Sequence, residues 1–133
     1  MIIDVNESLA GAYWAEAAQR QALRNGTREQ RIEYQSRVFP VEDALASRID
    51  ANEPTLLADL VAIAEAAPDI EMLSLFGAGI VWEYLYNTPD KNAAAIADAA
   101  MTSSAFMEAL RAAFAGWDGL GPHAKHHLKP LLD

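Results

Sequence analysis

The chain has 133 residues, the size of one globular domain with its own core. It carries 19 acidic and 10 basic side chains, a formal net charge of −9, so we expect neither nucleic acid nor an anionic membrane as a partner. Cysteine is absent, which excludes disulfides, thiolate zinc sites and thiol nucleophiles. The sequence has no run of about 18 apolar residues and no N-terminal signal-peptide pattern, which predicts a cytoplasmic protein.

Alanine dominates the composition, with 27 residues, and hydrophobic residues make up 52% of the chain. Alanine is the best helix former and lets helices pack closely, whereas the β-branched residues that favour strands are few and scattered. The sequence therefore predicts an all-α fold: a compact single-domain bundle of about seven or eight short helices over residues 1–133. A helical-repeat-like arrangement remains an alternative, although no sequence period supports it.

The first predicted helix covers residues 6–24 and begins at Asn6, a good N-cap residue. The second follows over residues 27–38, because Thr27 and Gln30 have the spacing of a capping box. This second helix is strongly charged, and four side chains offer it an inner face: Ile32, Tyr34, Gln35 and Phe39.

Six more helices are predicted downstream, and the apolar residues recur in most of them at helical spacing. Pro54 suits the first turn of the second of these six, and Thr102 or Ser103 caps the last. We expect a single domain with its core at residues 53–117. A loop at 118–122 and a short basic tail to residue 133 are expected to follow it. The expected ranges are 41–51, 54–67, 69–76, 80–87, 88–101 and 103–117.

Two glycines interrupt the apolar stretch 75–85. Glycine is costly inside a helix, so we expect Gly77 to cap one helix and Gly79 to let the next begin close by, as in a tight helix–helix corner. The alternative is an anion-binding backbone nest. A phosphate loop, however, has more glycines, a preceding strand and a lysine.

Residues 56–117 resemble a family of small bacterial all-helical domains of unknown function. The family pattern is a Leu-Gly-x-Gly turn followed by a Leu-Glu-x-Leu-Leu helix, then a Ser-rich link and a helix ending in an aromatic residue. Here the matching segments are 75–79, 82–85, 102–104 and 106–117, with Ile80 in place of the usual proline and Trp82 shifting Glu83 by one position. The resemblance implies an all-helical domain and carries no activity, so no functional residue is transferred.

Glu83 is the most unusual acid, because it lies within the apolar run 80–86. A buried carboxylate needs a partner, and we expect Arg48, Arg111 or a helix N-terminus to supply it. The alternative is a carboxylate that contacts a ligand or a partner.

The only histidines are His123, His126 and His127, and on a helix the first would share a face with the other two. They are weak candidates for a metal site, because no Glu lies between them and Lys125 and Lys129 add positive charge. A solvated basic tail is the preferred interpretation. We therefore assign no metal, no cofactor and no catalytic residue, and enzymatic activity stays open but disfavoured.

A small acidic helical protein without a catalytic motif fits a non-enzymatic, protein-binding antagonist, of the bacterial immunity or antitoxin type. Acidic side chains would steer a basic partner, and a few aromatics would anchor it. The candidate partner-binding residues are Glu42, Asp43, Asp50, Glu53, Asp59, Glu83 and Tyr84.

Two alternatives belong to other classes. A small-ligand-binding or enzymatic domain would use Glu83 in a concave pocket with convergent polar groups. A structural module would instead bury its aromatic face between copies of itself.

Overall fold

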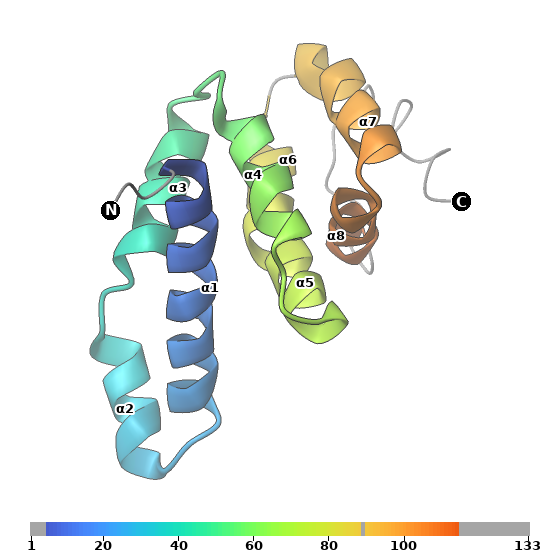
Figure 1. Ribbon diagram of the computed structural model, residues 1–133. Coiled ribbons are helices and arrows are strands. Elements are labelled where there is room, and N and C mark those ends of the chain that lie inside the picture. The colour runs from blue at the N-terminus through green and yellow to red at the C-terminus, as the bar shows by residue number, and fades with distance from the viewer. Residues whose placement is uncertain (1–4, 89, 115–133) are drawn as a thin grey trace.

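The computed structural model describes residues 5–88 and 90–114, and within these ranges every regular element is a helix. The all-α prediction is confirmed. In chain order the helices are α1 (Val5–Arg24), α2 (Arg28–Ser36), α3 (Pro40–Asp50), α4 (Leu56–Glu65), α5 (Ile70–Phe76), the π-helical segment η1 (Gly77–Val81), α6 (Trp82–Asn87), the 3₁₀ turn η2 (Asp90–Asn92), α7 (Ala93–Thr102) and α8 (Ser104–Phe114) (Figure 1).

One hydrophobic core joins α1 and α3 through α8. Its largest fully buried side chains include Phe76 on α5 and Phe106 on α8, with aliphatic residues of α3, α4 and α7 around them. The helices that meet here are short, so their stability comes from packing an apolar stripe rather than from intrinsic propensity. The helix α4 lies between α1 on one side and α8 on the other (Figure 1).

The helices α1 and α2 form a hairpin whose end extends beyond the core (Figure 1). The predicted capping box is present: the Gln30 amide donates to the Thr27 hydroxyl at 3.2 Å, and the Thr27 amide donates to the Gln30 side chain at 2.8 Å. The predicted inner face of α2 is wrong, because α2 has no buried residue. Ile32 is 55% exposed and Gln35 is exposed, whereas Tyr34 and Phe39 are half-buried against each other.

The predicted corner at Gly77 and Gly79 is also wrong. Gly77 has φ −61° and ψ −48°, so the chain does not leave the helical conformation there. The helix runs on from Ile70 to Asn87 through the π-helical segment, in which the Trp82 amide donates to the Gly77 carbonyl five residues earlier. The expected seven or eight separate helices is therefore slightly too many.

Gly77 has a tertiary role instead. A Cβ atom placed on Gly77 would lie 2.2 Å from the carbonyl oxygen of Ala109 and 2.9 Å from the Cβ of Ala112. The backbones of η1 and α8 thus meet with no side chain between them. Around Gly79 a Cβ atom would find nothing within 4 Å.

Side-chain caps mark two further helix starts. Asp69 accepts a hydrogen bond from the Met72 amide at 2.8 Å at the start of α5, and Ser103 accepts one from the Phe106 amide at 3.2 Å at the start of α8. Pro54 lies in the turn before α4 rather than in its first helical turn. Asn52 precedes it with a φ of 51°, a left-handed conformation that asparagine tolerates better than most residues.

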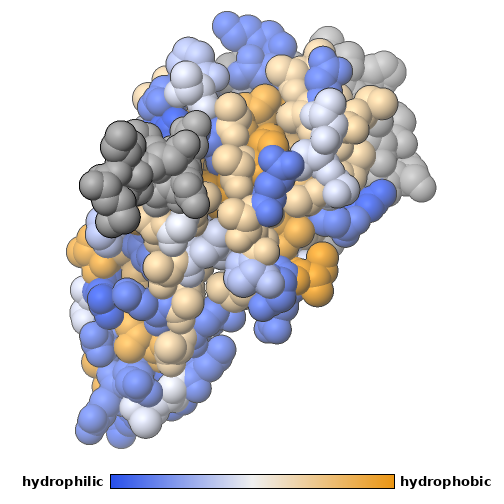
Figure 2. Space-filling view, viewed as in Figure 1, coloured by the Kyte–Doolittle hydropathy of each residue, from blue (hydrophilic) through white to orange (hydrophobic). Residues whose placement is uncertain are grey.

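The surface is uneven in hydropathy. On the face shown in Figure 2, strongly hydrophilic residues gather around the end of the α1–α2 hairpin, whereas α4 and α7 show a paler, alanine-rich surface. Within the described residues no helix combines the length and the apolar character needed to cross a membrane.

Candidate functional site: a cleft between α1 and the α5–α6 helix

A cleft of about 410 Å³ lies between α1 and the continuous helix α5–η1–α6, and residues of α2 and α3 also line it. Tyr13, Arg20 and Arg24 are spaced by seven and four residues, so one face of α1 presents them all to the cleft. The opposite wall includes Gly79 and Glu83. No motif in the sequence indicates this cleft, because its walls come together only in the fold.

An aromatic cluster forms one wall. Tyr13, Trp14 and Phe76 meet edge to face, with ring centroids 4.9 to 5.8 Å apart. The indole nitrogen of Trp14 donates to the carbonyl oxygen of Ile63 at 2.8 Å, which ties α1 to α4. Such edge-to-face pairs add to the stability that area burial supplies, so this wall is well fixed.

Arg20 is one of two arginines that line the cleft. It forms an ion pair with Glu42, and its Nη2 donates to the hydroxyl of Tyr13 at 3.3 Å. The guanidinium also lies over the rings of Tyr13 and Phe39, 5.4 and 5.8 Å from their centroids. Burial raises the pKa of Tyr13, so its hydroxyl stays protonated at neutral pH. Arg20 is therefore already neutralised within the fold.

Glu16 lies beside this pair and was missed by the sequence analysis. It is 7% exposed, and its two carboxylate oxygens accept hydrogen bonds from the Val41 and Glu42 amides, each at 3.2 Å. These are the first amides of α3, whose own N-cap residue, Phe39, provides no side-chain bond. Glu16 thus caps α3 from α1, and burial raises the pKa of its carboxyl group.

Glu83 lies half-buried on the α6 side of the cleft. The expected partners do not reach it, because Arg48 pairs with Glu53 and Asp59, and Arg111 pairs with Glu108. Among the described residues no ion pair or side-chain hydrogen bond engages the Glu83 carboxylate, so the expectation that Arg48 or Arg111 pairs with it is wrong. Within residues 5–88 and 90–114, Glu83 is thus a half-buried carboxylate that lines an aromatic cleft without a paired cation.

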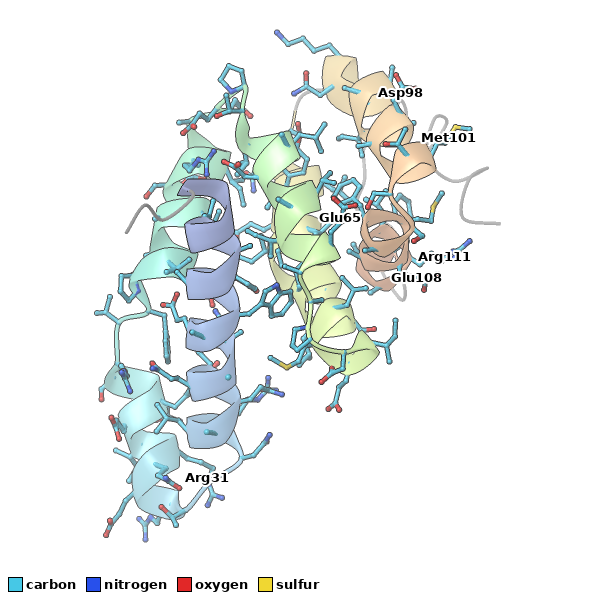
Figure 3. The ribbon with its side chains drawn as sticks, in the orientation of Figure 1. Arg31, Glu65, Asp98, Met101, Glu108 and Arg111 are labelled. Carbon is cyan, nitrogen blue, oxygen red and sulfur yellow. The ribbon has the colours of Figure 1, made fainter. Side chains whose placement is uncertain are left out.

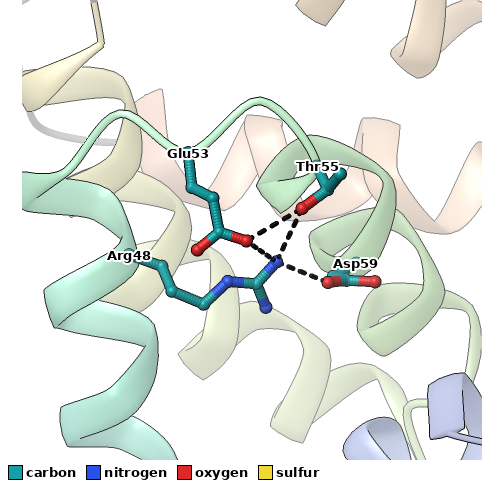
Figure 4. A network of polar contacts seen from close by, with 4 residues as sticks. All are labelled: Arg48, Glu53, Thr55 and Asp59. Carbon is teal, nitrogen blue, oxygen red and sulfur yellow. Dashed lines mark hydrogen bonds and ion pairs between the residues drawn. The ribbon is translucent and has the colours of Figure 1, made fainter.

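Two of the other candidate acids belong to an internal network. The Nη2 atom of Arg48 lies 2.6 Å from a carboxylate oxygen of Asp59 and 3.1 Å from one of Glu53 (Figure 4). Glu53 also accepts a hydrogen bond from the Thr55 hydroxyl at 2.9 Å. The hydrogen bond from Thr55, followed by the one from Arg48, lowers the pKa of Glu53. These acids hold α3 to α4 across the link between them.

The remaining candidates divide into exposed and buried ones. Asp43 and Asp50 are exposed, and they lie seven residues apart on one face of α3. Tyr84 is 7% exposed and belongs to the core, where burial raises its pKa. Of the seven residues, Glu42 and Glu83 are the two that line the cleft.

The three histidines lie outside the described residues. Within residues 5–88 and 90–114, no group of three or more His, Asp or Glu side chains is arranged to hold a metal ion.

No protein-family model, curated protein or solved structure matches this chain.

Proposed function

We propose that this protein is a non-enzymatic binding module that covers a basic surface of a partner protein, as an immunity protein or antitoxin does. The observation that carries the proposal is the Glu83 carboxylate, which lines an aromatic cleft and forms no ion pair with any described residue. A net charge of −9 supports it, because the field of an acidic protein attracts and orients a basic partner before contact.

The internal ion pairs change which acids are suitable for a test. Reversing the charge of Glu42 would break its pair with Arg20, and reversing Glu53 or Asp59 would break the Arg48 network. Asp43 and Asp50 are exposed, and neither forms an ion pair in the described part of the chain. They report on long-range attraction with little damage to the fold.

The test uses the whole protein as bait in an extract of its source, and then measures the affinity of a purified captured protein. We expect a stoichiometric basic protein that dissociates as salt rises. Glu83→Gln should weaken its binding about tenfold or more, since removing one partner of a desolvated charge pair costs about 2 kcal/mol or more. The double variant Asp43→Lys/Asp50→Lys should mainly slow association.

Glu65→Gln is the matched control. Glu65 is an exposed acid at the end of α4 and does not line the cleft (Figure 3). The variant Glu65→Gln makes the same change in net charge as Glu83→Gln. If both variants bind the captured protein equally well, the cleft is not the contact, and if no basic protein is captured at low salt, the proposal fails.

A small-ligand-binding function for the same cleft is the second candidate. Its volume falls in the range of about 300 to 1,000 Å³ that is usual for ligand sites, and it combines aromatic rings with a few polar groups. Self-association through the aromatic face is a third idea, which a mass measurement over a range of concentrations would test.

A further inference from the structure

The charges that line the cleft are not equally available. Arg20 and Glu42 neutralise each other, and Tyr13 takes a further donor of Arg20. Arg24 is exposed at the C-terminal end of α1. Glu83 is left as the half-buried charge without an internal partner in the described residues. A ligand group that pairs with the Glu83 carboxylate must carry a positive charge.

The walls around this carboxylate are aromatic. Trp82 lines the cleft next to Glu83 in sequence, and its ring stacks on Tyr86 with centroids 5.5 Å apart and an interplanar angle of 15°. Tyr13, Trp14 and Phe76 line the cleft from α1 and α5. Ring faces attract ammonium and guanidinium groups, and ring edges and aliphatic side chains pack against an alkyl stem.

The wall formed by the α5–α6 helix is also open at one backbone position. Gly79 lines the cleft, and a Cβ atom there would meet nothing within 4 Å. It belongs to a π-helical segment, a type of irregularity that is frequent at functional sites. A ligand can therefore approach the α5–α6 helix closely at this point.

We propose that the cleft binds a guanidinium or ammonium group on a flexible apolar stem, with Glu83 pairing the charge and the aromatic walls holding the stem. The stem and charge are those of an arginine or lysine side chain, or of a free alkyl cation. This inference rests on the proposed function in taking the group from a basic partner, but the chemistry of the cleft can be tested on its own.

The first experiment titrates the ¹⁵N-labelled protein with butylguanidinium, and in parallel with its neutral isostere butylurea and with the anion pentanoate. We expect saturable shifts of amide and indole signals of cleft residues with butylguanidinium, at a dissociation constant of the order of a millimolar. Butylurea and pentanoate should bind at least tenfold more weakly. Equal binding of butylurea, tighter binding of pentanoate, or no saturable shifts with butylguanidinium would overturn the proposal.

Two variants test the site by different means. Glu83→Gln removes the charge and should weaken butylguanidinium binding at least tenfold, whereas Glu65→Gln should leave it unchanged. Gly79→Leu keeps the charge and places a side chain on the wall formed by the α5–α6 helix, so it should also abolish binding. Far-UV circular dichroism and thermal unfolding check that each variant is folded. Retained binding in both cleft variants would contradict the assignment.

A final arm separates the two sources of the cation. A pentapeptide with central arginine, glycine elsewhere and blocked ends presents the side chain as a protein would. If this peptide binds with the same dependence on Glu83, the cleft accepts a partner's side chain. If butylguanidinium binds and the peptide does not, the cation site stands while the proposed protein-binding function falls. A basic partner whose binding ignores Glu83, together with failure of butylguanidinium, overturns the inference alone.

Discussion

Two glycines two residues apart have opposite structural roles. Gly77 permits backbone contact between η1 and α8, and Gly79 faces open space. Both lie in the helical segment, so a left-handed conformation is not the reason for either. The apolar residues on either side of Gly77 and Gly79 follow one continuous helical stripe, which in hindsight indicates an unbroken helix: Leu73, Phe76, Ile80, Val81, Tyr84 and Leu85 are all buried.

We expect Gly77→Ala to destabilise the protein by about 3 kcal/mol or more, since the added methyl group overlaps the Ala109 carbonyl and the backbones must separate. Gly79→Ala should instead raise the free energy of unfolding by about 0.5 to 1 kcal/mol, because alanine is the better helix former and meets no atom. Urea unfolding of the two variants measures both effects. Similar changes in the two would show that intrinsic helix propensity, not the contact with α8, determines the outcome.

Glu16 provides the second prediction for a single residue. Glu16→Ala leaves two partly buried backbone amides at the start of α3 without their acceptor. We therefore expect the free energy of unfolding to fall by about 1 to 2 kcal/mol. Glu16→Gln keeps one amide acceptor and removes the charge.

The stability of the protein should also depend on pH through Glu16. Burial raises the pKa of the Glu16 carboxyl group in the folded protein, so protonation of this group favours folding. This contribution to the free energy of unfolding is fully present below the ordinary glutamate pKa and is lost as pH rises through the pKa of the folded state. The wild type should therefore lose stability relative to Glu16→Gln as pH rises from about 4 to 7. Chemical unfolding of both proteins across this range checks the sign, and an unchanged or opposite difference would contradict it.

At the scale of elements, the network around Arg48 joins α3 to α4 (Figure 4). Arg48 and Asp59 side chains are each 20% exposed, so this pair is less screened than an ordinary surface pair. The exposed pair of Arg111 and Glu108, three residues apart on α8, offers a comparison within a single helix (Figure 3).

We expect Arg48→Ala to cost about 1 to 2 kcal/mol, since it leaves Asp59 partly buried and unpaired. Arg111→Ala should cost less than about 0.5 kcal/mol, as is usual for exposed pairs. Thermal unfolding of the two variants gives the comparison. Equal losses would mean that the link between α3 and α4 contributes no more than an isolated surface pair.

The position of α2 could not be predicted from its sequence. The charged residues and apolar spacing of α2 fit an amphipathic helix, which predicts that Ile32 packs into the core. The hairpin instead places α2 along the outer part of α1, beyond the reach of the core, so that only Tyr34 and Phe39 are partly covered (Figure 1). Spacing alone shows that a face is apolar and does not show whether another element covers it.

For the whole molecule, the all-helical fold class and most core positions could be predicted from the sequence. Alanine content favours helices, and the spacing of apolar residues shows which face of a helix is apolar. The caps at Thr27 and Ser103 were also predictable, because capping depends on neighbouring residues. The candidate site was only partly predictable. The apolar run around Glu83 made this acid a candidate, whereas the cleft depends on a contact between α1 and the α5–α6 helix, which three other helices separate in the chain.

The distribution of buried residues leads to one prediction for the molecule as a whole. The single core joins α1 and α3 through α8, whereas α2 contributes no buried residue. We expect hydrogen exchange to begin in α2, with its amides exchanging well before those of α4 and α8, and the remaining helices to unfold together. Protection of α2 equal to that of α4 in the isolated protein would contradict this.

The contact at Gly77 also determines how the protein responds to load. Because η1 touches α8 backbone to backbone, the helix that walls the cleft has no compressible layer of side chains behind it at this point. Force applied at the Gly79 side of the helix passes directly to α8 rather than being absorbed by rotamer changes. We therefore expect this wall to be rigid near Gly77 and to keep the same shape whether the cleft is empty or occupied.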